Sequence, residues 1–197
     1  MRISHSLALL RALVSKLRNI SYKMINISYD KKQMLQDINV SKTVVCETLT
    51  EASDPAFVQQ DQAYLAIKGK TPTELLPVLN DALTHRFSDV KHEYLFRNLL
   101  YPLKKAVGNA YKRGNHKDPD KWIYVEIIVT PKGAFVDVTD EGSGFDVQDI
   151  LKKFLAGDKY FTHGGSGFKQ FKKTKAVVSF ANGGSTWRLR FLKDIEA

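Results

Sequence analysis

Two neighbouring segments of the chain, at residues 72–87 and 92–113, have the hydrophobic pattern of amphipathic helices. Apolar side chains recur there at steps of three and four residues, so each set falls on one helical face. Thr71 predicts the start of the first helix, because Pro72 suits a first turn and Glu74 stands three residues after the cap. The apolar positions are Leu75, Leu76, Leu79, Leu83 and Phe87 in the first helix and Leu95, Leu99, Leu103, Val107, Ala110 and Tyr111 in the second.

The second helical segment contains a proline and ends at two helix-terminating residues. Pro102 predicts either a kink or the first residue of a new helix. Gly114 and Asn115 predict the end of the helix, and a polar loop follows them.

Six other segments are rich in β-branched and aromatic residues, which is typical of strands. The turn residues at 131–133 and 182–183 predict hairpins. Helices are expected at 147–155 and 168–174. The order of these elements predicts an α/β (α+β) two-layer sandwich, with one mixed β-sheet covered on one face by helices. The predicted strands lie at 40–49, 63–67, 122–130, 134–139, 175–180 and 185–192.

The composition is that of a folded domain with a strong positive charge. Apolar residues make up 43% and charged residues 26%, which excludes disorder along the whole length and a membrane-embedded protein. The formal charge of +9 favours an anionic partner: nucleotide, nucleic acid, acidic protein or anionic lipid. The single Cys46 excludes an intramolecular disulfide and a cysteine-rich zinc site, and it favours the cytoplasm.

Residues 1–60 are assigned to an N-terminal extension of unknown role, before a domain at 61–197. Residues 1–23 carry basic but no acidic side chains, and Leu7, Leu10, Val14 and Leu17 share one helical face. This segment fits a basic amphipathic helix that packs on the domain or touches a membrane surface. It also fits an organellar transit peptide, or a translated leader before a start at Met24 or Met34.

A glycine-rich segment at residues 140–146, with the sequence Asp-Glu-Gly-Ser-Gly-Phe-Asp, directly follows a predicted strand. Asp140 at the strand end can accept a hydrogen bond from an exocyclic amine, such as that of adenine. Gly142 and Gly144 allow a backbone to come close to a ligand. The spacing matches neither a calcium loop nor a dinucleotide fingerprint. Taken alone, the segment fits a plain connecting turn equally well.

Two further motifs contain residues suited to binding phosphates and a metal ion. Residues 164–168, with the sequence Gly-Gly-Ser-Gly-Phe, open a predicted helix, whose N-terminal amides can bind an anion. A flexible loop is the equal alternative. Asn109 has apolar neighbours and can offer an oxygen to Mg²⁺. For a single asparagine, a hydrogen bond to a neighbouring loop is the simpler interpretation.

Together and in this order, the three motifs resemble the GHKL ATPase superfamily, the histidine kinase-like ATPases. Within it, they look most like the anti-sigma-factor serine kinases and their relatives. Residues 104–115 look like the family's N-box, residues 140–146 match its Asp-x-Gly-x-Gly-Phe box, and residues 164–168 resemble its lid glycine box. Residues 183–191 look like its closing strand. The resemblance covers about residues 63–192 and implies the GHKL ATPase fold.

The resemblance also implies a site for ATP and Mg²⁺. Asp140 would bind the adenine amino group, partly through water, and Gly142 and Gly144 would let the loop pass close to the base. Asn109 would bind a Mg²⁺ ion that bridges the phosphates, and Lys112 would lie near those phosphates. A mobile lid would cover the phosphate tail, and its residues would be Gly165, Ser166 and Gly167.

One position departs from the family pattern. The catalytic base, a glutamate four residues before the metal-binding asparagine, is replaced by Lys105. A lysine cannot orient or deprotonate an attacking hydroxyl in the same way. Because Lys105 shares a helical face with Asn109, we expect it to point toward the phosphates. The chain is then either a serine/threonine protein kinase or ATPase of the GHKL type, or a pseudoenzyme with negligible turnover.

These motifs predict an ATP-binding regulatory protein. Its expected partner is a sigma factor or an anti-anti-sigma-like protein, and a homodimer is compatible with the resemblance. A membrane span is not expected, because no run reaches the ~18 apolar residues that one requires. One alternative is a basic nucleic-acid-binding α/β protein, although the motifs of common RNA modules are missing. The other is a detached ATPase domain of a sensor histidine kinase.

Overall fold

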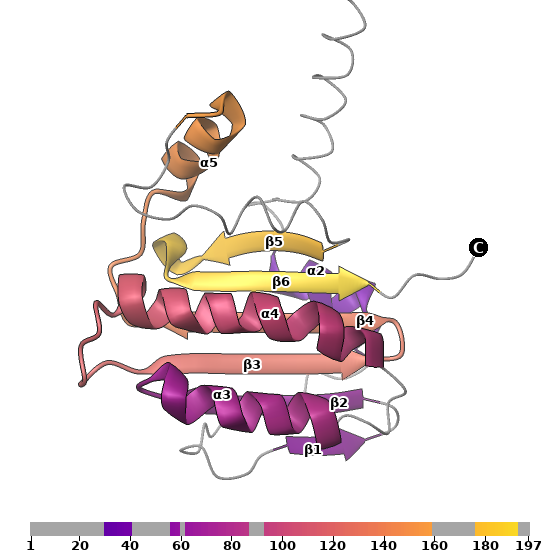
Figure 1. Cartoon of the computed structure of the whole chain (residues 1–197). Coiled ribbons are helices and arrows are strands. Elements are labelled where there is room, and N and C mark those ends of the chain that lie inside the picture. Colours follow the sequence, from indigo (N-terminus) through magenta and orange to yellow (C-terminus); the bar gives the residue numbers. More distant parts are fainter. Residues whose placement is uncertain (1–29, 41–55, 60–61, 87–92, 159–175, 193–197) are drawn as a thin grey trace, which may run out of the picture.

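The structure is a computed structural model that describes residues 30–40, 56–59, 62–86, 93–158 and 176–192. It contains one six-stranded sheet in the order β1-β2-β3-β4-β6-β5, with helices packed against it (Figure 1). The elements, in chain order, are α2 (Lys31–Asp37), β1 (Ala56–Gln59), β2 (Gln62–Gly69), α3 (Pro72–Asp81), η1 (Ala82–Arg86), α4 (Glu93–Asn109), η3 (Ala110–Gly114), β3 (Ile123–Thr130), β4 (Gly133–Asp140), α5 (Val147–Ala156), β5 (Ala176–Ala181), η4 (Asn182–Gly184) and β6 (Thr186–Leu192).

All neighbouring strands of this sheet are antiparallel. The two-layer α+β sandwich is confirmed, but the prediction of a mixed sheet is wrong. The helical connection between β2 and β3 explains the difference. Because α3 leads away from the end of β2 and α4 returns to it, β3 starts where β2 ends, with Gly69 opposite Ile123. Tight turns at the ends of β3 and β5 reverse the chain in the same way.

α3 and α4 pack side by side on one face of the sheet (Figure 1). Thr71 caps α3 as predicted, because its side chain accepts a hydrogen bond from the Glu74 N–H. Pro102 lies inside a continuous α4. Alternate residues of the strands complete this main core. The buried helical residues are Leu75, Leu79, Ala82, Leu83, Leu99, Leu103, Ala106, Val107 and Ala110.

α2 partly covers the opposite face of the sheet. Helices therefore lie on both faces, and not on one face as the sequence predicted. The side chains of Met34 and Ile38 are 0% exposed and pack against Tyr64, Ile128 and Phe135. The strands place enough apolar side chains on this second face to bury a short helix. Within the predicted 1–60 extension, α2 and β1 are therefore parts of the sheet's own packing.

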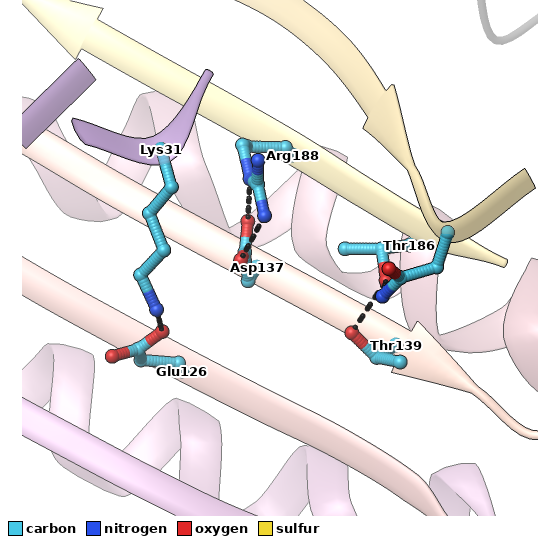
Figure 2. Close-up of polar contacts among 7 residues, drawn as sticks. Lys31, Glu126, Asp137, Thr139, Thr186 and Arg188 are labelled. Carbon is cyan, nitrogen blue, oxygen red and sulfur yellow. Dashed lines mark hydrogen bonds and ion pairs between the residues drawn. The ribbon is translucent and has the colours of Figure 1, made fainter. Parts of the chain in front are cut away.

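Polar side chains on the same face form pairs across the strands and with α2 (Figure 2). Lys31 of α2 forms an ion pair with Glu126 of β3. Asp137 of β4 accepts two hydrogen bonds from Arg188 of β6, at 2.8 and 3.0 Å. The hydroxyls of Thr139 and Thr186 lie 2.9 Å apart. The two cross-strand pairs support the register of β4 and β6, and the Lys31–Glu126 pair joins α2 to β3.

α5 stands beyond the β5 edge of the sheet (Figure 1). Asp146 caps its start by accepting a hydrogen bond from the Asp149 N–H. Its apolar side chains form a small separate cluster with Phe145 and Phe180. The helix expected at 168–174 and the segment 1–23 lie outside the described residues. The strand expected at 40–49 also lies outside them, except for residue 40.

Replacing Met34 with alanine should destabilise the fold by about 2–4 kcal/mol, because it removes a fully buried side chain and leaves a cavity. The measurement is the free energy of unfolding in denaturant. Gln36→Ala, at an exposed position of the same helix, is the matched control and should change stability by less than about 0.5 kcal/mol. Equal and small effects of both substitutions would show that α2 does not contribute to the fold.

Candidate functional site

Three segments that lie far apart in the chain meet at one end of the sheet. They are the end of the long α4–η3 helix, the loop after β4, and the turn between β5 and β6. Asp140, the last residue of β4, donates its N–H to the Ser185 carbonyl at 3.0 Å. Phe145 donates its N–H to the Gly183 carbonyl at 2.9 Å. These two bonds fasten the 140–146 segment to the β5–β6 turn at both of its ends.

The Asp140 carboxyl lies against the end of the helix. A Cβ atom placed on Gly114 would lie 2.1 Å from Asp140 Cγ, so only a glycine fits there without moving the carboxyl. Asp140 Oδ1 accepts a hydrogen bond from the Gly142 N–H at 2.9 Å. Among the described residues, Oδ2 accepts no hydrogen bond. The carboxyl is thus held in place through one oxygen and offers the other as an acceptor.

The surroundings of Asp140 oppose its ionisation. Burial raises the pKa of this carboxyl above its ordinary value, while the Gly142 N–H and the positive charges of Lys121 and His116 act in the opposite direction. Because burial prevails, the ionised carboxylate costs folding free energy at neutral pH. A residue that costs stability in its charged form is a candidate for a functional role.

Gly142 and Gly144 are required by contacts within the chain itself. A Cβ atom on Gly142 would lie 2.1 Å from the carbonyl oxygen of Gly114, and one on Gly144 would lie 2.1 Å from that of Gly183. Gly144 also has a φ of +70°, a conformation that favours glycine. The structure therefore gives both glycines a role in the packing of neighbouring backbone, and the predicted close approach to a ligand stays a prediction.

Asn115 and Glu141 also belong to this site, although the sequence pattern does not predict them as site residues. Asn115 is 0% exposed: its side-chain N–H donates to the Trp122 carbonyl, and its side-chain oxygen accepts from the Glu141 N–H. The Glu141 carboxylate accepts from the Trp122 N–H and from the hydroxyl of Tyr124. For Asn115, the sequence predicts only a position at the helix end. Its position directly after a glycine at that end was the available signal.

The other predicted site residues on the helix are exposed. Asn109 is the last residue of α4, and the chain continues from it into the wider π-helical turn η3, a feature that is frequent at functional sites. Lys112 lies in that turn and is also exposed. η3 ends at Gly114 beside Asp140, so Asn109 and Lys112 lie on the helix that leads to the carboxyl.

Lys105 is exposed, and its ammonium lies 5.5 Å from the centre of the Tyr101 ring, one turn earlier in α4. A cation over an aromatic face is weakly stabilised there. The predicted lid residues Gly165, Ser166 and Gly167 lie outside the described residues.

The chain was compared with protein-family models and with curated proteins, and neither comparison gave a match. Within the described ranges, no helix is both long and apolar enough to cross a membrane. In the same part of the chain, no three side chains of His, Cys, Asp or Glu are grouped as metal ligands.

Replacing Asp140 with asparagine should raise the melting temperature at pH 7. The folded-state pKa of Asp140 lies above its unfolded value, so the parent loses stability as pH rises through this window, whereas the variant does not. Its side-chain oxygen can still accept from Gly142. Thermal melts at pH 7 and below the ordinary pKa of 3.8 measure the effect, which should shrink at the lower pH. A lower melting temperature at pH 7 would instead make the ionised carboxylate a structural group.

Proposed function

We propose that the chain is an ATP-binding regulatory protein that resembles the anti-sigma-factor serine kinases of the GHKL type. The observation that carries this proposal is the half-buried Asp140 carboxyl, held by the Gly142 N–H and facing the side-chain-free Gly114. An ionised acceptor with one oxygen available suits an exocyclic amine such as that of adenine. Because the carboxyl is already oriented, binding does not have to order it.

The helix that ends at Asp140 would supply the phosphate and metal contacts. Asn109 would offer its amide oxygen to Mg²⁺, which binds hard oxygen ligands and keeps several waters. Lys112 would neutralise phosphate charge from the next turn. Both side chains are exposed and therefore available to a ligand. The lid would be formed by Gly165, Ser166 and Gly167, as the motif resemblance implies.

Nucleotide binding, rather than phosphotransfer, would be the main activity of this site. Phosphotransfer depends on positioning and on a group that orients the attacking hydroxyl. Lys105 has no acceptor for that proton. The bound nucleotide would instead order the lid and change the affinity for a protein partner. That partner would be a sigma factor or an anti-anti-sigma-like protein, and the chain would act in the cytoplasm, with a homodimer as its assembly.

Calorimetric titration with ATP, with and without Mg²⁺, should show micromolar-scale binding, on the order of −8 kcal/mol. Gly114→Ala should weaken it about tenfold or more, because the added methyl group displaces the Asp140 carboxyl. Gly114 is not among the glycines with positive φ, so alanine can adopt its backbone conformation and the effect comes from the contact of the methyl group with Asp140.

The matched control is Gly108→Ala in the same helix, where a Cβ atom would meet nothing within 4 Å. It should stabilise the helix by about 0.5–1 kcal/mol and leave ATP affinity unchanged. Undetectable ATP binding by the parent chain would reject the proposed function. Unchanged affinity in Gly114→Ala would reject Asp140 as the adenine-binding group.

ATP hydrolysis by the parent chain should be negligible. Lys105→Glu should weaken Mg²⁺-free ATP binding roughly threefold to tenfold, because it reverses an exposed charge near the phosphates. Lys104→Glu makes the same charge change at the neighbouring exposed position and should have a smaller effect. The measurements are ATP titrations without Mg²⁺ and a phosphate-release assay. Robust hydrolysis by the parent would contradict the pseudoenzyme interpretation.

A further inference from the structure

Two lysines lie against one tryptophan ring at the same end of the sheet. The ammonium groups of Lys68 and Lys70 are 4.5 and 5.1 Å from the centre of the Trp122 ring. Lys68 belongs to β2, Lys70 follows it, and Trp122 directly precedes β3. We call these three residues the Lys–Trp cluster. All three side chains are partly exposed.

Neither ammonium of the Lys–Trp cluster forms an ion pair with a residue in the described part of the chain. Two carboxylates near the cluster accept hydrogen bonds from backbone N–H and hydroxyl groups rather than from these ammonium groups. Glu74 accepts from the backbone N–H of Lys70 and from the hydroxyl of Thr71, and Glu141 accepts from the Trp122 N–H and the Tyr124 hydroxyl. The indole attracts both cations, but it carries no net charge and does not compensate them. An anion bound beside them would reduce their mutual repulsion.

Hydrogen bonds fix the backbone of Trp122 in the cluster. Its N–H donates to Glu141 at 2.9 Å, and its carbonyl accepts from the buried Asn115 at 2.9 Å. The backbone that carries the indole is therefore held relative to the helix end and the 140–146 segment. An anionic partner does not have to order this backbone when it binds, which favours recognition.

We propose that the Lys–Trp cluster is a docking surface for an acidic segment of a partner protein. A nucleobase stacked on a face of the indole that an ammonium group covers would have to displace that ammonium, whereas a carboxylate would not. Carboxylate side chains can pair directly with the two ammonium groups, which form no ion pair within the described part of the chain. The net charge of +9 adds a long-range attraction for such a segment. The proposal does not depend on ATP binding.

Tryptophan fluorescence of the full chain tests this surface without nucleotide. The chain has two tryptophans, so a Trp187→Phe background leaves Trp122 as the only reporter. The probes are an oligo-glutamate peptide and oligothymidylate, each titrated at low and moderate salt. The double substitution Lys68→Glu with Lys70→Glu should weaken peptide binding about fivefold to tenfold, as expected for the loss of two exposed ion pairs.

The matched control is Lys132→Glu with Lys152→Glu, which makes the same charge change at two exposed lysines outside the cluster. It should weaken peptide binding less than about twofold. Melting curves establish that each variant is folded, and Lys68→Gln with Lys70→Gln replaces the first variant if that one unfolds. An equal loss in both double variants, or no binding of the peptide, would overturn the proposal. Tighter binding of oligothymidylate that depends on Lys68 and Lys70 would overturn it in favour of a nucleic-acid surface.

Discussion

The contact between the end of the long helix and the end of β4 determines the geometry of the candidate site. Here two glycines, Gly114 and Gly142, let a helix end and a loop approach so closely that a single methyl group on either would overlap the other segment or the Asp140 carboxyl. The same contact places Asn115 where it bonds both to Glu141 and to Trp122. The orientation of the acidic group and the position of the Trp122 backbone therefore depend on one backbone contact.

The antiparallel sheet brings the required segments to one edge. β2 and β4 end there, β3 and β6 start there, and the α4–η3 helix arrives there because α3 and α4 form a returning pair. The β5–β6 turn closes the edge by accepting the Asp140 and Phe145 N–H groups. Loops at such an edge can vary in sequence without disturbing the core, which is why binding residues are often located in them.

The face of the sheet that α3 and α4 cover is held by apolar packing. The opposite face, which α2 partly covers, also contains paired charged side chains. Burial raises the pKa of Asp137 even though Arg188 is bonded to both of its oxygens. A pair of this kind contributes little net stability, but removing one partner would leave a buried charge. Asp37 of α2 pairs with Arg190 at 3.2 Å, so charge complementarity, together with Met34 and Ile38, positions the helix. This face therefore selects one register of strands and one position of α2.

The sequence alone determined the local structure of the chain. The Thr71 cap, the apolar steps of α3 and α4, the tight turns and the helix end at Gly114 depend on contacts between near neighbours, and the structure has each of them. Only the tertiary structure decided which strands are neighbours, that α2 and β1 join the sheet, and that Asn115 and Trp122 belong to the site. These features depend on contacts between residues far apart in the chain, and a periodicity read along one segment contains no information about its partner. The reason for glycine at position 114 is likewise a distant side chain, that of Asp140.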